Sequence, residues 1–372
     1  MKNKILIFTS ARSDYSILRN LIVKFDNKLK KNFKLIVIGN HFEKEFGYTY
    51  SEVISDRIKN KLPIKLNYNK KKKPNTNILI SQIIKSLENK INPKVNAAIL
   101  LGDRFETFAA AIYCLNKNIP IIHIGGGSVT AGSLDEYYRN FISSISNLHL
   151  VETNLHKKNL VERGINTKMI YVVGVLSFEN LKKVKFLKKK KLLNELGIRN
   201  NLNKIIISTL HPETTNKLNV NIQNLKILLN VLYKFKNTHN IIITYPNADE
   251  GFEKFIEIIN KYKNKKNFYI FKNLGYKRYF NVLKMSDFMI GNSSSGIIES
   301  GYFNLPVINL GIRQNKRFRG SNVIDCEFDC KKIQQKIKKF IRKKKKFNTP
   351  YKFKKNTYEI YKIIMQFIAN KK

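Results

Sequence analysis

The sequence predicts an α/β protein made of two doubly wound domains, each a parallel sheet covered by helices. Short apolar runs of four to six residues alternate along the chain with amphipathic stretches of helical length. The alternation pauses near residues 174–191, where a lysine-rich run follows an apolar run, and then starts again. Two similar halves joined near residue 180 favour two Rossmann-like domains that face a cleft.

The elements expected in each half follow from these runs. In the first half, buried strands are expected at residues 5–8, 34–38, 97–101, 119–124, 149–152 and 170–173, with helices over 15–25, 77–87 and 106–115. In the second half, strands are expected at residues 204–208, 240–244, 268–271, 288–290 and 307–310. The domains expected are residues 1–178, residues 179–350, and a terminal helix over residues 351–372, which could pack on either domain, with packing back on the N-terminal domain as the favoured alternative.

The charge of the chain is strongly positive. The 372 residues include 70 Lys and Arg against 26 Asp and Glu, a formal net charge of +44. Such an excess is typical of proteins that bind nucleic acid, but no helix-turn-helix, zinc-finger, RRM or KH signature accompanies it. The run at residues 331–346 carries Ile333, Ile337, Phe340 and Ile341 at helical spacing, which favours a packed apolar face with solvated lysines. We therefore expect no specific nucleic-acid partner.

The location expected is the cytoplasm. No apolar run approaches the ~20 residues of a membrane span, and the apolar stretch near the N-terminus is short for a signal peptide. The three cysteines, Cys114, Cys326 and Cys330, form no CxxC pair. An odd number of unpatterned cysteines is typical of reduced thiols in a cytosolic protein.

Polar side chains follow two strands of the first half. Arg12 and Ser13 come after the first strand, where small residues let backbone N–H groups approach an anion and an arginine adds a bidentate phosphate contact. The alternative is an ordinary helix N-cap by Ser10 or Ser13. Asp103 and Arg104 follow the strand at 97–101, a good position for catalytic groups, although Asp103 could instead cap the next helix with Glu106.

Three consecutive glycines, Gly125 to Gly127, follow the strand at 119–124. Glycine there is costly unless the backbone needs positive φ or a ligand approaches closely. Asp135 and Glu136 then stand at the expected start of a helix, where acidic residues also simply suit the helix dipole.

The second half repeats this arrangement. His211 ends the strand at 204–208, and a histidine at such a place is as often structural as catalytic. Residues 291–299 join small hydroxyl residues, Ser293 and Ser294 among them, to Glu299, a pattern suited to a diphosphate and to ribose hydroxyls. Arg313 follows the next strand and supplies another cation.

Taken in order, these segments resemble the UDP-N-acetylglucosamine 2-epimerase family, whose architecture is similar to glycosyltransferase-B folds. The closer resemblance is to the hydrolysing branch that feeds sialic-acid and legionaminic-acid synthesis. It rests on residues 10–15, His41 with 46–49, 102–106, 123–135, 211–212, 246–249, 291–299 and 311–314, and so covers nearly the whole chain.

The resemblance implies an enzyme that eliminates the nucleoside diphosphate across C1–C2 to give a glycal, then adds water with inversion at C2. It implies Asp103 and Asp135 as acid/base groups and His211 as a contact to the leaving diphosphate that could protonate it. The nucleotide-diphosphate contacts implied are Arg12, Ser13, Arg104, Ser293, Ser294 and Arg313, with Glu299 on the ribose. No cofactor and no metal is implied; the partner is a small nucleotide sugar, and dimerisation is common in the family.

One departure from the family pattern bears on activity. Gly125 and Ser128 stand where many members carry acids, and losing one general acid or base typically costs about 10²–10⁴ in rate. Either Glu136 or Glu106 substitutes, or the substrate differs, or activity is low. The alternatives left open are a non-hydrolysing epimerase, a nucleotide-sugar-binding homologue with weakened catalysis, and a polyanion-binding protein. Also left open are the nucleotide, UDP or GDP, and the identity and C4 substituent of the sugar.

Overall fold

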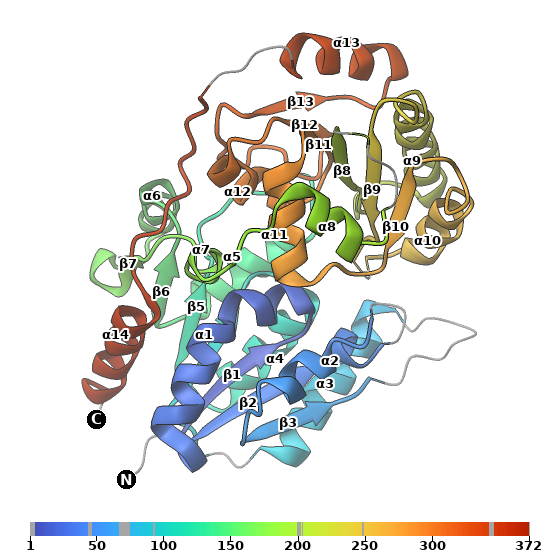
Figure 1. The fold of residues 1–372 in the computed structure, drawn as a ribbon. Helices are drawn as coiled ribbons and strands as arrows, with labels where there is room; N and C mark the ends of the chain where they lie inside the picture. Colours follow the sequence, from blue (N-terminus) through green and yellow to red (C-terminus); the bar gives the residue numbers. More distant parts are fainter. Residues whose placement is uncertain are drawn as a thin grey trace. The chain divides into compact units, whose positions relative to one another are not determined.

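A computed structural model describes residues 4–43, 47–66, 75–91, 94–198, 202, 204–247, 249–341 and 346–371. The chain divides into two compact units. Unit 1 comprises Met1–Ser128, Asp135–Asn180 and Lys352–Lys372, and unit 2 comprises Val129–Leu134 and Leu181–Tyr351. Each unit contains one parallel sheet with helices on both faces (Figure 1), which confirms the α/β class and the two Rossmann-like domains. The lysine run at 70–73, Phe46 and Ala248 lie outside the described residues.

Unit 1 is built on a sheet with strand order β3-β2-β1-β4-β5-β6-β7. Its strands are β1 (Ile5–Thr9), β2 (Phe33–Ile38), β3 (Lys61–Ile64), β4 (Ala97–Leu101), β5 (Ile121–Ile124), β6 (Leu148–Val151) and β7 (Ile170–Val172). Its helices are α1 (Arg12–Leu29), α2 (Tyr50–Ser55), α3 (Thr76–Lys90), α4 (Phe105–Asn116), α5 (Asp135–Ile145), α6 (Asn154–Glu162) and α14 (Thr357–Ala369), while α7 (Ser177–Lys182) leads out of the unit. The strands expected from the apolar runs are all present.

Alternate residues of each strand in unit 1 enter different cores. Ile5 and Ile7 of β1 pack with α1 and α14 on one face, whereas Leu6 and Phe8 pack with α3 and α4 on the other. This is the period-two alternation of a strand that is buried on both faces. It explains why the sequence signal here is a continuous apolar run rather than an alternating one.

The apolar-run criterion missed β3 and, in unit 2, β13 (Val323–Cys326). Both are edge strands of their sheets. β3 reads Lys-Leu-Pro-Ile, and Pro63 is tolerated there because an edge strand leaves one side of its backbone without a neighbour. β3 and β13 are half-exposed and include Lys61, Pro63 and Asp325, so they lack the apolar run that the other two edge strands, β7 and β10, retain.

Unit 2 is built on a second parallel sheet, with strand order β10-β9-β8-β11-β12-β13. The remaining strands are β8 (Ile205–Thr209), β9 (Asn240–Thr244), β10 (Phe268–Phe271), β11 (Phe288–Gly291) and β12 (Val307–Leu310). The helices are α8 (Lys189–Glu195), α9 (Leu218–Tyr233), α10 (Phe252–Asn260), α11 (Gly275–Met285), α12 (Ser295–Ile298) and α13 (Cys330–Ile341).

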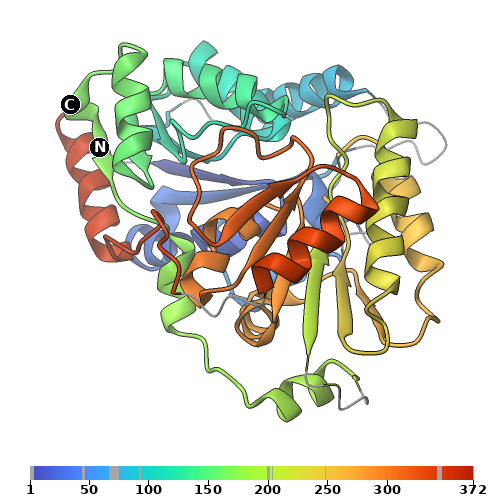
Figure 2. The same ribbon diagram turned by 90° about the horizontal axis from the view of Figure 1, so that it is seen from above.

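Helices α9, α10 and α13 cover one face of the unit 2 sheet with a single core. Figure 2 shows α9 in yellow and α13 in orange-red next to each other across that face. Ile333 and Ile337 of α13 are buried in this core, while Lys331, Lys332 and Lys338 are exposed. The prediction of a packed apolar face with solvated lysines is therefore confirmed for these residues; the side chains of Phe340 and Ile341 lie outside the description.

The C-terminal helix is shorter than expected. α14 begins at Thr357, because residues before it are extended: Phe353 forms an antiparallel bridge with Gly174, and Lys355 N donates to the Val173 carbonyl at 3.0 Å. Asn356 is the N-cap of α14 and accepts from Tyr358 N and Glu359 N. The helix itself packs against α1 in unit 1 (Figure 1).

The three thiols form no disulfide; Cys114 and Cys326 are buried and Cys330 is partly buried. Among the described helices, none combines the length and the apolar character that crossing a bilayer requires.

All six histidines are buried, and four of them have depressed pKa values. Burial lowers the pKa of His41 to about 3 and those of His123, His149 and His239 to about 4. As pH falls, these histidines take up protons in the unfolded chain before they do so in the folded protein. Their contribution to stability is therefore complete above about pH 6.5, the unfolded pKa, and is lost as pH falls toward their pKa values in the folded protein.

We expect the protein to lose stability between pH 7.5 and pH 5.0, by roughly 2 kcal/mol for each of His41, His123 and His149 and by less for the less deeply buried His239. His149→Phe removes one buried titrating ring from β6 and should reduce that loss by about the same amount. Urea denaturation of both proteins at the two pH values measures it. Equal pH dependence in the wild type and the variant would contradict the assignment.

Candidate functional site

The predicted site residues of unit 1 follow strands that are neighbours in the sheet. Arg12 and Ser13 come after β1, and Asp103 and Arg104 come after β4, which pairs with β1. Asp135 is the first residue of α5, beyond the glycine-rich segment that follows β5. Because all these strands are parallel, their carboxyl ends lie on one edge of the sheet, where ligands of open α/β sheets bind.

Arg139 is the centre of a charged cluster at this edge. Its guanidinium forms ion pairs with Asp103 and with Glu136, the latter at 2.8 Å, and donates to the Ser128 carbonyl at 2.9 Å. The Arg139 side chain is 2% exposed. Burial alone would lower the pKa of Arg139, but the Asp103 and Glu136 carboxylates outweigh it and the net shift is upward. The planar fork of an arginine can hold several acceptors at once, so Arg139 fixes the Asp103 carboxylate in place.

Sequence reasoning missed this role for Arg139. The alternative role of Asp103 as a helix cap is wrong, because the N-cap of α4 is Arg104, which makes no side-chain capping bond. Periodicity places Arg139 on a helix, one turn after Glu136, and gives no signal that it is buried against a residue 36 positions earlier. Only the tertiary structure brings the two together.

Two further acids were candidates to replace the missing carboxylates. Glu106 is completely buried, and its carboxylate accepts hydrogen bonds from Arg104 Nε and Nη2, each at 3.1 Å. Burial raises the pKa of Glu106, while the Arg104 pair opposes this shift. Glu136 is bonded to Arg139 and accepts from Asn140 at 3.2 Å. Both acids are thus committed to protein partners, and Arg104, which is partly exposed, is paired with the buried Glu106.

Two of the three glycines, Gly125 and Gly127, have backbone conformations that favour glycine. Gly125 and Gly127 have φ of +88° and +75°, a region that other residues rarely adopt. A Cβ on Gly127 would lie 2.2 Å from the His156 carbonyl oxygen, so the backbones touch there. Ser128, which follows, is buried, and its hydroxyl has no hydrogen-bond partner among the residues that the structure describes. A glutamate at position 125 would therefore need a different local backbone.

The segment after β1 is organised by Asp14. Its Oδ2 accepts from Ser10 N at 3.2 Å, from the Ser10 hydroxyl at 2.8 Å and from Ala11 N at 3.1 Å. The N-cap of α1 is Ala11, so neither Ser10 nor Ser13 caps the helix. Arg12 and Ser13 form the first turn of α1, with the Ser13 hydroxyl donating to Asp14 at 3.0 Å.

In unit 2, Asn292 links the ends of three strands. It follows β11, is fully buried, and bonds to both backbone groups of His211 after β8. The backbone carbonyl oxygen of Asn292 accepts from Arg313 Nη1 at 3.4 Å and from Gln314 Nε2 at 3.0 Å, and both of these residues follow β12. One asparagine thus sets the relative positions of His211 and Arg313, a role that no local sequence pattern indicates.

Arg313 is held by two carboxylates. Its guanidinium lies 3.5 Å from Asp249, which follows β9, and its backbone N–H donates to Glu213 at 3.0 Å. Glu213 also accepts from Ile312 N at 2.7 Å, and burial raises the pKa of the Glu213 carboxyl although these N–H groups oppose the shift. The tight turn at Gly311 permits this contact, since a Cβ there would lie 2.3 Å from Glu213 Oε1.

Ser293, Ser294 and Glu299 surround the short helix α12. Ser293 and Ser294 precede it and Glu299 follows it, and all three are partly buried. Gly291 at the end of β11 approaches β8 so closely that a Cβ would lie 2.0 Å from the Thr209 carbonyl oxygen. The turn therefore starts directly beside the strand that carries His211.

Residues Val129–Leu134, between the glycines and Asp135, pack in unit 2. Ala131 N donates to the Asn315 carbonyl at 3.1 Å, and Leu134 N donates to the Thr214 hydroxyl at 3.2 Å. A Cβ on Gly132 would lie 2.0 Å from the Ile312 carbonyl oxygen. The segment is thus fitted against the loops that carry Arg313 and follow His211.

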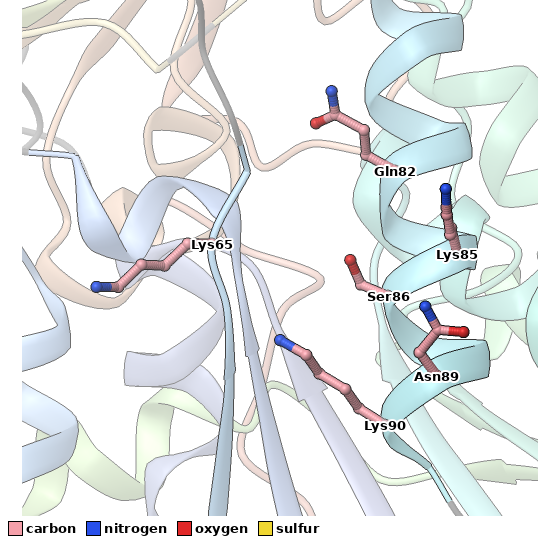
Figure 3. A pocket seen from close by; sticks show the side chains of 6 residues that line it. All are labelled: Lys65, Gln82, Lys85, Ser86, Asn89 and Lys90. Carbon is pink, nitrogen blue, oxygen red and sulfur yellow. The ribbon is translucent and has the colours of Figure 1, made fainter.

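A cavity of about 250 Å³ lies elsewhere in unit 1, along α3 (Figure 3). It is lined by Lys65, Gln82, Lys85, Ser86, Asn89 and Lys90. The predicted site residues take no part in it. Among the described residues, no group of three or more His, Cys, Asp or Glu side chains is placed to hold a metal ion.

Comparison with known proteins identifies the family. The family model described as UDP-N-acetylglucosamine 2-epimerase matches residues 24–365. The chain belongs to the UDP-N-acetylglucosamine 2-epimerase family. A GDP/UDP-N,N'-diacetylbacillosamine 2-epimerase (hydrolyzing) from Campylobacter jejuni is 36% identical over 334 residues, which cover 88% of this chain and 85% of the relative. The polysialic acid biosynthesis protein P7 of Escherichia coli is 32% identical, over 99% of this chain and 95% of its own.

Solved structures of the family share the fold. The UDP-GlcNAc 2-epimerase of Methanocaldococcus jannaschii, in complex with UDP-GlcNAc and UDP, superposes with a TM-score of 0.78. The alignment covers 98% of this chain and 99% of that one, at 18% identity. The two-sheet architecture described above is therefore that of the family.

Arg139→Lys tests the charged cluster of unit 1. Lysine keeps the charge but not the fork, so it cannot hold Asp103, Glu136 and the Ser128 carbonyl together. Displacing a catalytic group by about 1 Å costs about 10²-fold in rate, so, with Asp103 in the acid/base role predicted from the sequence, we expect kcat to fall by that order in a folded protein. Arg163→Lys is the matched control, because Arg163 is 40% exposed and lies 3.6 Å from Glu136. Equal kcat values for the two variants would contradict the role of Arg139.

Proposed function

We propose that the protein is a hydrolysing 2-epimerase that converts a nucleoside-diphosphate N-acetylhexosamine into the nucleoside diphosphate and a free N-acetylmannosamine-type sugar. The observation that carries this proposal is the match to a hydrolysing family member over 88% of the chain. The carboxylates of unit 1 and the basic groups of unit 2 have the chemistry that this reaction needs. The sugar is further proposed to belong to sialic-acid or legionaminic-acid synthesis.

The reaction needs two acid/base groups. A base removes the C2 proton, the C2–H electron pair forms the C1=C2 bond, and the C1–O bond breaks with its pair leaving on the diphosphate oxygen. Water then adds, its oxygen to C1 and a proton to C2 from the opposite face. Because inversion uses both faces of C2, two groups must act, and we assign these roles to Asp103 and Asp135.

The leaving nucleotide carries negative charge, and the proposal assigns it to basic and small polar groups. His211 contacts the departing diphosphate. The other contacts proposed are Arg12, Ser13, Arg104, Ser293, Ser294 and Arg313 to the diphosphate, and Glu299 to the ribose. The placement of Arg313 supports its part in this proposal, because its guanidinium is held 3.4 Å from the Asn292 backbone carbonyl oxygen and 3.5 Å from the Asp249 carboxylate.

Two finer parts of the proposal concern setting. We place the enzyme in the cytoplasm, which is supported by three thiols of which none is in a disulfide. We also propose a homodimer, as is common for the family, and light scattering of the purified protein tests it.

Product analysis tests the function. We expect release of free UDP or GDP from at least one of four substrates: the UDP- and GDP-linked forms of N-acetylglucosamine and of N,N'-diacetylbacillosamine. In H₂¹⁸O the heavy oxygen should enter the C1 hydroxyl of the free sugar and not the nucleotide, because the C1–O bond is the one that breaks. In D₂O, deuterium should appear at C2. Label in the nucleoside diphosphate, or deuterated nucleotide sugar returned intact, would exclude the hydrolysing elimination.

Asp103→Asn tests the acid/base assignment. Removing a general acid or base costs about 10²–10⁴ in rate, so nucleotide release should fall by that factor. Asp325→Asn is the control. Asp325 lies on β13, an edge strand of unit 2, and its side chain is 55% exposed and pairs with Arg319. Gly125 and Ser128 favour one competing function, a nucleotide-sugar-binding homologue. Trace turnover that is equal in the wild type and in Asp103→Asn would support that alternative.

A further inference from the structure

The backbone of His211 is held on both sides by one side chain. His211 N donates to Asn292 Oδ1 at 2.7 Å, and Asn292 Nδ2 donates to the His211 carbonyl at 2.9 Å. Asn292 is 0% exposed, and β11 and β8 are neighbours in the sheet. Because the amide satisfies both backbone groups, it replaces a strand partner beyond the end of β8 and fixes the direction in which the imidazole leaves the backbone.

A second contact determines the state of the imidazole ring. The backbone N–H of Asn247, in the segment after β9, donates to His211 Nδ1 at 2.9 Å. A backbone N–H can only donate, so Nδ1 must present its lone pair. The neutral ring therefore carries its proton on Nε2. The tautomer is thus assigned from a donor whose role is fixed, and does not depend on the placement of hydrogen atoms.

We propose that the Asn247 N–H is a positioning group that holds His211 as a neutral Nε2–H donor to the departing diphosphate. This inference rests on the proposed function and makes it more specific. His211 then transfers no proton. When the C1–O bond breaks, the electron pair stays on the diphosphate oxygen, and the Nε2–H stabilises the added charge by a hydrogen bond.

The chemistry of the leaving group agrees with this role. A terminal phosphate group loses its last proton with a pKa of about 6. A nucleoside diphosphate that departs at neutral pH is therefore stable as the deprotonated anion and needs no proton from the protein. A general acid would instead require the doubly protonated ring. Its Nδ1–H would point at the Asn247 N–H, and the bond that orients the ring would be lost.

Side-chain replacements of His211 separate a neutral donor from a general acid. Losing one such donor costs about 10²–10³ in kcat, which we expect for His211→Ala. Glutamine can place an N–H where Nε2 lies, but it cannot act as an acid. We therefore expect His211→Gln to recover at least about tenfold over His211→Ala, and His211→Asn, whose amide lies nearer the Nδ1 position, to recover less. If the kcat of His211→Gln were no higher than those of His211→Ala and His211→Asn, the donor role would be overturned.

Nitrogen NMR of the ring tests the tautomer without turnover. In ¹⁵N-labelled wild type at pH 7.5, the His211 ring, assigned by the signals lost in His211→Gln, should show the Nε2–H tautomer. Asn247→Pro removes the N–H and should give a mixture of tautomers. Asn247→Ala, the matched control, keeps the backbone N–H and should keep the wild-type pattern.

The outcomes distinguish this inference from the proposed function. A wild-type ring that is Nδ1-protonated or charged, or equal spectra for the proline and alanine variants, would overturn the inference while nucleotide release by the wild type continued. Failure of every substrate in the product assay would overturn the function, while the ring spectra would still report whether the Asn247 N–H sets the tautomer.

Discussion

Parallel strand pairing is the constraint on which the rest of this structure depends. Every strand pair in both sheets is parallel. In such a sheet the carboxyl ends of all strands lie on one edge, so short polar segments from distant parts of the sequence meet there. In unit 1 these segments carry Asp103 and Arg12, and in unit 2 they carry His211 and Arg313. The placement of these predicted site residues is thus a consequence of strand direction.

Each unit adds one buried polar residue that organises its edge. In unit 1, Arg139 joins Asp103 to Glu136, because a guanidinium can bind several acceptors in one plane. In unit 2, the side-chain amide of Asn292 donates to and accepts from the His211 backbone, and the backbone carbonyl of Asn292 accepts from Arg313, so one residue joins the two. The glycines serve the same purpose, since turns such as Gly311 let the backbone come close enough for these bonds.

The charge of +44 has little to do with the site. The basic groups that the proposed reaction uses are few, and Arg104 and Arg313 are bound to carboxylates of the protein. Many lysines are on exposed helix faces, as in α13, where the apolar residues between them are buried. The histidines contribute no surface charge because all six are buried.

The sequence by itself determined the α/β class, the central strands and the order of the polar segments, because a strand buried on both faces must be a continuous apolar run. It could not reveal β3 and β13, because these two edge strands are half-exposed and polar residues or proline interrupt their apolar residues. It also placed the start of the C-terminal helix too early, since the pairing of Phe353 with Gly174 is a long-range contact. Only the tertiary structure decided that Arg139 meets Asp103 and that Asn247 fixes the His211 ring. These are bonds between residues far apart in the chain, and no local pattern records them.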